Sequence, residues 1–220
     1  MSAALASAIT LIPAYLLGAM PWGLWIGLLR GVDVRRQGSG NLGATNVYRL
    51  LGPGLGITVL ILDAAKGALA VLWGLHGPAA AAFPGGAAWA AIASGITAIL
   101  GHMLSVFARF RGGRGVATTI GVFLALAPGA MGLGLGAFVL AFAFTRRVSV
   151  GSLALAVVFP IGVLVTMRAG PDRTRLFVLA LVAALLIIVR HIPNIRRLAR
   201  GQERELNLRG KGTATPRKES

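Results

Sequence analysis

The chain has 220 residues, of which 56% are hydrophobic and 13% are charged, and its mean hydropathy is +0.78. This apolarity lies outside the range of soluble globular proteins and indicates a polytopic membrane protein. The net charge of +16 must lie in loops, because charged side chains are costly in hydrocarbon, and the lack of cysteine excludes disulfides and thiolate chemistry. Basic loops follow either from the positive-inside rule or from binding of anionic headgroups or phosphorylated substrates.

Five apolar segments are long enough to cross a bilayer, at about residues 5–29, 54–73, 87–106, 150–167 and 174–189. A further apolar segment, 116–144, is too long for one ordinary span and has Pro128 and Gly129 in its middle, where a helix can break. Splitting it into two short helices of about 12 and 15 residues places the basic clusters on one side, which the positive-inside rule identifies as cytoplasmic. Only Arg168, Arg173 and Arg175 then lie on the outer side.

The sequence therefore predicts an all-α, polytopic membrane protein with seven transmembrane helices, its N-terminus outside and its C-terminus cytoplasmic. Residues 1–205 are expected to form one membrane-embedded domain. Residues 206–220 lack periodicity and are predicted to be a disordered basic tail.

The first polar cluster is "RRQGSGNLGATNVYR", residues 35–49. Its glycines permit a row of free backbone N–H groups between Gly38 and Gly43, which would bind an anion. Thr45 and Asn46 are predicted to cap a short helix that ends at Leu51, and Thr45 and Arg49 share one face of it. An ordinary turn with positive-inside arginines explains this loop equally well.

The second cluster is "GHMLSVFARFRGGRGVATT", residues 101–119. If the preceding span continues to about Arg109, then His102, Ser105 and Arg109 lie along one helical face. The "RGGRG" sequence places two guanidinium groups around a flexible backbone before a new helix N-terminus, which suits an anion. Alone, it is better explained as a snorkelling flank of the membrane.

The third cluster is "RHIPNIRRLARGQE", residues 190–203. Pro193 suits the first turn of an interfacial helix, Gly201 suits its end, and His191 and Asn194 can point back towards the bundle. A basic amphipathic anchor, with Ile195 and Leu198 in lipid, is the alternative.

Two smaller features remain. Ser149 and Ser152 lie at the start of a span, where they either cap the helix or contact an anion. Asp63 and Lys66 lie inside a span, where they either neutralise each other or face a polar cavity. The sequence has no His–Asp box, G-x-S-x-G, H-E-x-x-H or Walker sequence, and its few acids predict no metal site, so phosphate recognition must use arginines, hydroxyls and amides.

The segments "GSGNLGATNVYRLLG", "GHMLSVFARFRGGRGVAT" and "RHIPNIRRLARGQE" resemble, in order and spacing, the three motifs of the bacterial acyl-phosphate-dependent glycerol-3-phosphate acyltransferases, the PlsY family. The resemblance extends from the first span to about Glu203. It implies a seven-helix enzyme of the bacterial inner membrane whose active site faces the cytoplasm. Such an enzyme transfers a fatty acyl group from acyl phosphate to sn-glycerol 3-phosphate, giving 1-acyl-sn-glycerol 3-phosphate (lysophosphatidic acid) and phosphate, in the first step of phospholipid biosynthesis.

The resemblance also implies functional residues. Ser39, Arg49 and Arg114 would bind phosphate, and His191 and Asn194 would complete the catalytic set. Further substrate contacts are expected from Gly40, Asn41, Gly43, Thr45, Asn46, His102, Ser105, Arg111, Gly112, Gly113, Ser149, Ser152 and Glu203. The family usually has lysine at the positions of Arg111 and Arg114; arginine keeps the charge and binds phosphate bidentately, but it cannot lose a proton.

No cofactor and no nucleic acid are expected. The predicted partners are the two small-molecule substrates, the lipid bilayer and, as a candidate, a soluble enzyme that produces the acyl phosphate. Because an acyl phosphate has a good leaving group, positioning and charge stabilisation dominate the barrier. A substrate phosphate is expected to accept the hydroxyl proton, and the competing hypothesis makes His102 or His191 the general base.

A small transporter or flippase for phosphorylated compounds is the non-enzyme alternative. It predicts polar groups at the membrane midplane and often an internal repeat. The sequence has no evident repeat, and only Asp63 and Lys66 are candidates for the midplane. Polar residues gathered on one side favour an interfacial enzyme.

Overall fold

The computed structural model describes residues 1–207, and those residues form helices and connecting loops without a strand. The helices are α1 (Ala3–Ala19), α2 (Trp22–Leu29), α3 (Ala44–Leu51), α4 (Pro53–His76), α5 (Gly86–Met103), the 3₁₀ turn η1 (Val106–Ala108), α6 (Val116–Leu126), α7 (Pro128–Thr145), α8 (Val148–Thr166), α9 (Pro171–Arg190) and α10 (Ile192–Ala199). The predicted all-α class is confirmed. Most of the predicted tail, residues 208–220, lies outside the described residues.

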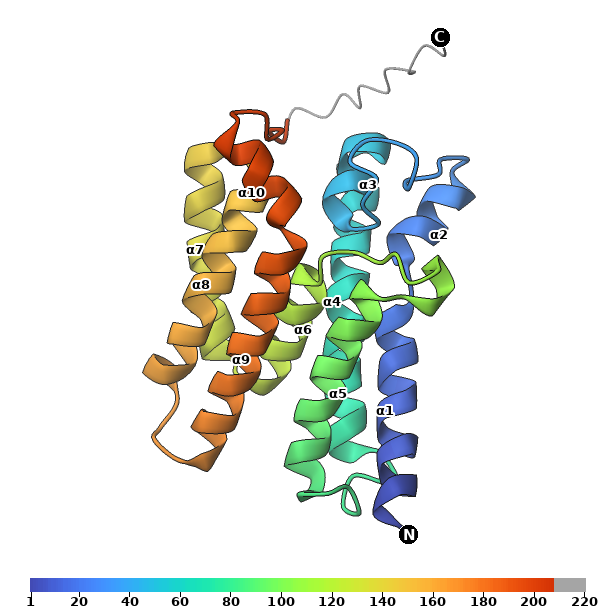
Figure 1. The fold of residues 1–220 in the computed structure, drawn as a ribbon, viewed down its shortest axis with the longest axis vertical. Coiled ribbons are helices and arrows are strands. Elements are labelled where there is room, and N and C mark those ends of the chain that lie inside the picture. The colour runs from blue at the N-terminus through green and yellow to red at the C-terminus, as the bar shows by residue number, and fades with distance from the viewer. Residues whose placement is uncertain (208–220) are drawn as a thin grey trace.

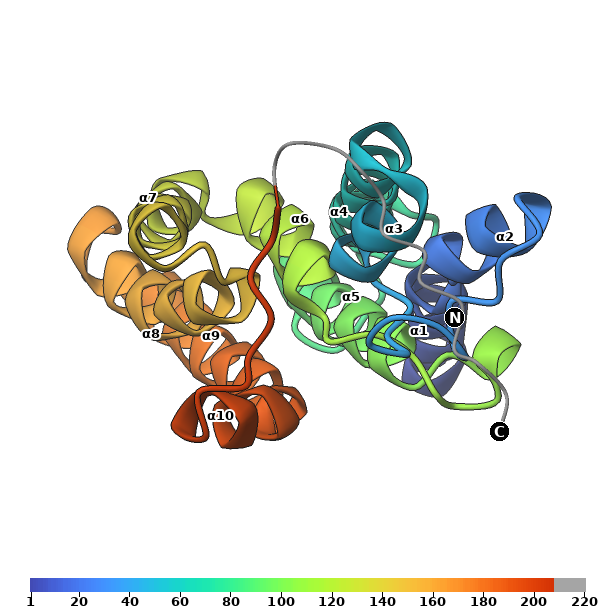
Figure 2. The ribbon, with the colours of Figure 1, turned by 90° about the horizontal axis from the view of Figure 1, so that it is seen from above.

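The long helices form two groups that meet at α6 (Figure 1). In the first group α1, α4 and α5 pack together, and α6 lies against α4. In the second group α7 packs on α8 and α8 on α9. The short helices α2, α3 and α10 lie at one end of the molecule, and the segment after α10 crosses between the two groups when seen from that end (Figure 2).

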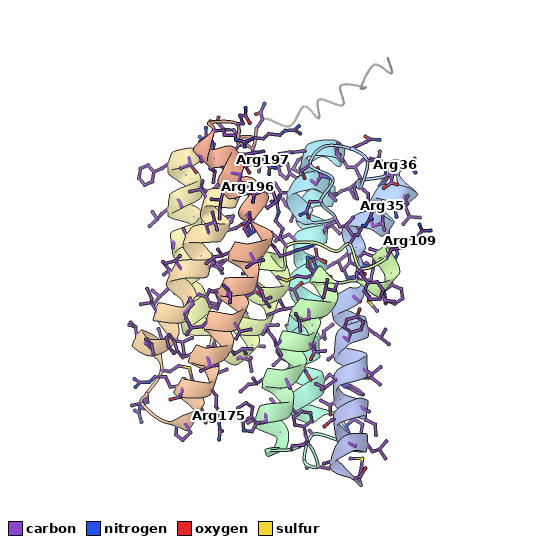
Figure 3. The ribbon with its side chains drawn as sticks, in the orientation of Figure 1. Arg35, Arg36, Arg109, Arg175, Arg196 and Arg197 are labelled. Atoms are coloured by element: carbon purple, nitrogen blue, oxygen red, sulfur yellow. The ribbon has the colours of Figure 1, made fainter. Side chains whose placement is uncertain are left out.

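The arginines follow this polarity. Arg35, Arg36, Arg196 and Arg197 lie at the end that carries α2, α3 and α10, whereas Arg175 lies at the opposite end (Figure 3). The separation agrees with the charge pattern from which the topology was predicted.

Within residues 1–207 four segments are long and apolar enough to cross a membrane, namely α4, α5 with the following 3₁₀ turn, α7 and α8. Six spans result if two bent pairs each count as one. The pairs are α1 with α2, bent by 41°, and α9 with α10, bent by 55°. The remaining segment of the predicted seven is α6, which has 11 residues and is therefore only about 16 Å long. Seven complete spans thus stay a prediction, because α6 is too short to cross the hydrocarbon alone.

Pro128 divides the long apolar segment as predicted. Helix α6 ends at Leu126 and α7 begins at Pro128, where the missing N–H is not needed. The second half is longer than expected, at 18 residues.

The first predicted span is also broken, which the sequence analysis did not anticipate. Helix α1 ends before Met20 and Pro21, and the break frees backbone carbonyl groups. Two of them find side-chain donors: the Ser105 hydroxyl bonds to the carbonyl of Ala19, and Lys66 Nζ donates to the carbonyl of Met20 at 2.8 Å.

The third span extends to Ala108, close to the expected Arg109, but it does not continue there as one α-helix. Helix α5 ends at Met103, a 3₁₀ turn follows, and Arg109 has a positive φ of 53°. His102 is helical, but Ser105 and Arg109 do not share its face. The chain turns here because Gly112 and Gly113 return to donate to the carbonyls of Met103 and His102, both at 3.1 Å.

Glycine allows α4 and α6 to approach closely. A Cβ on Gly121 would overlap the backbone of Ala64, and one on Gly67 would overlap the backbone of Thr118. Packing without side chains between the backbones is typical of membrane helices. This contact fixes the position of α6, which links the two helix groups.

We expect Gly121→Ala to destabilise the protein by about 1–3 kcal/mol, because the added methyl group overpacks a contact between two backbones. Gly132→Ala is the matched control, since a Cβ on Gly132 in α7 has no neighbour within 4 Å. Thermal unfolding in detergent measures both. Equal unfolding temperatures would show that the α4 and α6 contact adjusts freely.

Candidate functional site

Two adjoining cavities lie at the end of the molecule that carries α3 and α10. The larger has a volume of about 340 Å³ and the smaller about 170 Å³. Ser39, Arg49 and Arg114 line both of them. These three side chains come from two of the sequence motifs and mark the place where the cavities meet.

The two cavities differ in chemistry. Polar and charged side chains dominate the smaller one, which is also lined by Gly38, Asn194, Arg197, Glu203 and Arg204. The larger one has a polar end that includes Thr45, His102 and His191. Its apolar part is formed by Ile57 and Leu60 of α4, Ile120 of α6, and Leu135, Phe138 and Phe142 of α7.

The loop before α3 presents Ser39 to the cavities, and the last turn of α3 presents Arg49. Gly38 and Gly40 have positive φ values of 63° and 70°, which only glycine adopts easily. The buried Asn46 holds the loop together, since its Oδ1 accepts from Ser39 N at 2.8 Å and its Nδ2 donates to the carbonyls of Val34 and Gln37.

Two details of the prediction for this loop are wrong. The N-cap of α3 is Gly43, without a side-chain hydrogen bond, so Thr45 and Asn46 do not cap it. The N–H groups of Ser39, Gly40, Asn41 and Gly43 donate to partners in the loop or to Asn46 of α3, so they do not form the expected row of free donors. The side chains of Thr45 and Arg49 do line the same cavity.

The RGGRG loop is held from two sides. On one side Gly112 and Gly113 pack on α5, where a Cβ on Gly113 would overlap the His102 ring. On the other side Arg190 of α9 donates from Nη2 to the carbonyls of Gly112 and Gly113, both at 2.9 Å. The loop thereby directs Arg114 to the junction of the cavities, whereas Arg111 is exposed and lines neither.

Burial affects the charge of Arg114 only slightly at neutral pH. It lowers the pKa of this guanidinium to about 10, and the neighbouring Arg197, Arg49 and Arg190 add to the decrease while Glu203 opposes it. Arg49 also has a lowered pKa, again mainly through burial. Both side chains remain cations at pH 7 and can bind a phosphate dianion.

His191 and Asn194 point into the bundle, as predicted from their spacing. His191 Nδ1 lies 2.8 Å from the carbonyl of Ile187, so a proton on Nδ1 leaves Nε2 as the acceptor in the neutral ring. Both residues are buried, and they line the larger and the smaller cavity respectively. The break between α9 and α10 produces this orientation.

The segment after α10 lies over the site. Glu203 accepts from Asn194 Nδ2 at 2.6 Å and from Arg197 Nε at 2.8 Å, and Arg49 donates to the carbonyl of Arg204 at 3.2 Å. Leu206, which was assigned to the disordered tail, donates from its N–H to the carbonyl of Arg146 at 2.8 Å and lines the larger cavity. The ordered domain therefore continues beyond residue 205.

The carboxyl group of Glu203 has a lowered pKa and is ionised at neutral pH. Burial raises the pKa of its carboxyl group, but the hydrogen bonds from Asn194 and Arg197 together lower it by more than burial raises it. The pKa therefore lies below the ordinary value of 4.5. A carboxylate with a lowered pKa stabilises the folded state above its unfolded pKa, and this stabilisation is lost as the pH falls through the folded pKa.

Glu203→Gln should therefore unfold at a lower temperature than the wild type at about pH 7, and the difference should shrink as the pH falls below about 4.5. Thermal unfolding across this pH range is the measurement. The exposed Glu205, which pairs with Arg147 at 3.5 Å, supplies the control Glu205→Gln. A difference that stays constant with pH would show that the carboxylate charge does not contribute.

The structure brings many of the predicted residues together at the cavities. The predicted residues that line at least one of the two cavities are Ser39, Asn41, Gly43, Thr45, Asn46, Arg49, His102, Arg114, Ser152, His191, Asn194 and Glu203. Ser105, Arg111, Gly112, Gly113, Gly40 and Ser149 line neither cavity. Of the two alternatives for Ser149 and Ser152, capping is wrong, because Arg147 is the N-cap of α8 without a side-chain bond and Ser152 donates to the carbonyl of Val148. Contact with an anion stays a prediction, and Ser152 lines the larger cavity.

Four further residues contribute to the site: Tyr48, Asp63 and Arg197 line the cavities, and Arg190 holds the RGGRG loop. Arg190 and Arg197 belong to the third cluster, but their direction depends on the bend between α9 and α10. Asp63 was noted as an ionisable residue within a span, which is a signal for a functional position. The structure places its carboxylate in the wall of the larger cavity, 3.6 Å from His102 Nδ1.

Comparisons with known proteins agree with this geometry. A family model for glycerol-3-phosphate acyltransferases matches residues 8–201. A glycerol-3-phosphate acyltransferase of Trichlorobacter lovleyi is 45% identical over 193 residues, covering 86% of this chain and 92% of the relative. Glycerol-3-phosphate acyltransferase 1 of Deinococcus radiodurans is 45% identical over 205 residues, covering 92% and 96%.

Solved structures give the same result. The crystal structure of PlsY, an integral membrane glycerol 3-phosphate acyltransferase, in its glycerol 3-phosphate form superposes with a TM-score of 0.81 at 35% identity. The match covers 91% of this chain and 96% of that one. The lysophosphatidic acid form of that protein gives a TM-score of 0.79 at 34% identity.

Proposed function

This chain belongs to the glycerol-3-phosphate acyltransferase family, and from that premise we propose that it transfers a fatty acyl group from an acyl phosphate to sn-glycerol 3-phosphate. The products are 1-acyl-sn-glycerol 3-phosphate and inorganic phosphate. This reaction is the first acylation of phospholipid biosynthesis, and a soluble enzyme would supply the acyl phosphate.

One observation supports this reaction above others: a small polar cavity adjoins a larger cavity with an apolar part, and three phosphate-binding side chains line both. The smaller cavity suits the compact, doubly charged glycerol phosphate. The apolar part between α4, α6 and α7 suits a fatty acyl chain. Ser39, Arg49 and Arg114 then stand where the acyl phosphate and the acceptor hydroxyl meet.

The residues suit the chemistry of acyl transfer from a phosphate. The acceptor hydroxyl attacks the acyl carbonyl carbon, the carbon–oxygen bond to phosphate breaks, and phosphate leaves. Arg49 and Arg114 neutralise the charge that develops on the carbonyl and on the leaving phosphate, while the cavity walls hold the two reactants together. Arg49 Nε and Asn194 Oδ1 are buried without a hydrogen-bond partner within residues 1–207, which leaves them available to substrate.

The proposed orientation follows from charge. The end of the molecule that carries α2, α3, α10 and their arginines is assigned to the cytoplasm of a bacterial inner membrane. Both substrates are then reached from that side, the soluble one directly and the lipid-like one from the adjoining leaflet. Reactivity of single cysteines introduced at Arg36 and Asp172 towards an impermeant reagent tests this topology.

Phosphate release by the purified protein tests the reaction. Palmitoyl phosphate is supplied with and without glycerol 3-phosphate, and palmitoyl-CoA is the control donor. We expect release that depends on the acceptor, together with the 1-acyl product. Product from the CoA donor alone would overturn the donor assignment, and uptake by sealed proteoliposomes without acyl transfer would support a transporter instead.

The proton of the acceptor hydroxyl is proposed to go to a substrate phosphate, whose second pKa is about 6. The variants His102→Asn and His191→Gln should have a lower kcat where the lost side chain helped to position a substrate. The acid limb of the pH profile of kcat should keep its midpoint in both. The pH dependence of kcat for both variants is the measurement. A variant whose acid limb disappears would identify that histidine as the general base.

A further inference from the structure

A buried charged cluster lies deeper in the bundle than the phosphate-binding residues. Asp63 and Lys66 of α4 are 2% and 3% exposed, and His102 of α5 is 8% exposed. Lys66 Nζ lies 2.7 Å from Asp63 Oδ1, and His102 Nδ1 lies 3.6 Å from the same oxygen. Ionisable groups within membrane helices are costly, so a cluster of three requires a reason beyond packing.

The cluster has fixed points at both ends. At one end Lys66 Nζ donates to the carbonyl of Met20, which the break between α1 and α2 has freed. At the other end the His102 ring lies against Gly113, since a Cβ there would overlap its Nε2, Cε1 and Cδ2 atoms. The cluster therefore connects the break in the first span to the RGGRG loop.

Charge explains why both members of the α4 pair are present. Asp63 and His102 line the larger cavity, which also receives Arg114 and is proposed to hold an acyl phosphate. A bare carboxylate there would repel the substrate, and Lys66 neutralises it while fixing its direction. The carboxylate can then orient the imidazole electrostatically, since the 3.6 Å between Asp63 Oδ1 and His102 Nδ1 is longer than a hydrogen bond.

We propose that Asp63 is a positioning residue, which acts through His102 to hold the RGGRG loop and thereby Arg114 at the junction of the two cavities. Arg190 holds the same loop from the other side, through the carbonyls of Gly112 and Gly113. The inference rests on the proposed acyl transfer. It differs from simple neutralisation of two charges within a span, because it assigns the function to the contact between Asp63 and His102.

The two explanations predict opposite results for the uncharged double variant Asp63→Asn/Lys66→Met. This variant leaves no buried charge unpaired, whereas each single variant strands one charge. It also removes the Lys66 donor to the carbonyl of Met20, so its thermal unfolding is compared with that of Lys66→Met alone before kcat is interpreted. If the pair only neutralises itself, the double variant recovers wild-type kcat. Under our proposal its kcat stays about ten- to a hundredfold low, because Arg114 is misplaced.

Coupling to His102 is the second measurement. In the His102→Asn background the added Asp63→Asn/Lys66→Met change should alter kcat less than about twofold, since the contact is already lost. The same loss in both backgrounds would show that Asp63 does not act through His102. The proposal is overturned if Asp63→Asn/Lys66→Met recovers the wild-type kcat, or if that change lowers kcat equally with and without His102.

A second pair provides the matched control. Asp172 and Arg175 have the same i,i+3 spacing and an ion pair of 3.0 Å, but their side chains are 75% and 35% accessible. Arg175 lies at the opposite end of the molecule from α3 and α10 (Figure 3). Asp172→Asn/Arg175→Met should leave kcat unchanged. Wild-type protein without acyl transfer would overturn the proposed function, whereas active wild type with an active Asp63→Asn/Lys66→Met variant would overturn only this inference.

Discussion

Arg49→Ala is expected to reduce kcat/KM by about a thousandfold with both substrates present, the largest effect of any single substitution in the chain. Arg49 lines both cavities, so one guanidinium serves the acceptor phosphate and the acyl phosphate. Removing a single preorganised donor to a developing charge costs about 100- to 1,000-fold, and here the positioning of the second substrate is lost as well. Acceptor-dependent phosphate release from palmitoyl phosphate measures the change.

Two further variants show whether that loss is specific to Arg49 and whether it comes from charge or from hydrogen-bond geometry. Arg36→Ala is the control, because Arg36 is an exposed arginine of the same loop region with a side chain that is 87% accessible, and it should keep wild-type activity. Arg49→Lys keeps the charge but loses the fork of donors, so its activity should lie between the two. If Arg49→Ala kept more than about a tenth of wild-type kcat/KM, the cavity junction would not be the reaction centre.

Arg114→Ala is expected to reduce kcat/KM by about a hundredfold or more, while Arg114→Lys should stay within about tenfold of the wild type. The loop holds the side chain at the cavity junction through contacts of Gly112 and Gly113 that do not involve the guanidinium itself. A lysine ammonium can reach the same phosphate as a point charge, with fewer hydrogen bonds. Steady-state kinetics with glycerol 3-phosphate as the varied substrate separates kcat from KM.

Arg111→Ala provides the comparison within the same sequence. Arg111 is exposed and outside both cavities, so its removal should change activity less than about threefold. Equal losses for Arg111→Ala and Arg114→Ala would show that the net charge of the loop matters rather than the position of Arg114. A lysine variant as inactive as Arg114→Ala would instead show that the reaction depends on the bidentate geometry of arginine.

Much of the fold could be predicted because the responsible forces act locally along the chain. Apolar runs of span length, the break at Pro128 and the first-turn position of Pro193 all follow from hydropathy and from the geometry of proline. The break at Met20 and Pro21 was missed because the segment is apolar throughout. Its cost becomes acceptable only when Lys66 and Ser105, distant in sequence, bond to the freed carbonyls.

The site divides in the same way. The resemblance of the three motifs pointed to Ser39, Arg49, Arg114, His191 and Asn194, and these residues do line the two cavities. The individual hydrogen bonds could not be predicted from spacing. Asn46 holds the loop instead of capping α3, and Ser105 bonds to α1 instead of facing the cavity.

The membrane class, the helical architecture, the family and the three polar segments proposed to bear the chemistry could all be predicted, because hydropathy and residue type are properties of the chain alone. Which groups face one another depends on the packing of the helices. This packing brings Asp63 to His102, Arg190 to the RGGRG loop and Glu203 to Asn194, each pair far apart in sequence or separated by a bend. Such contacts depend on where helices cross and end, and that is set by the packing of glycine-lined backbones and by the capture of freed carbonyls across the whole bundle.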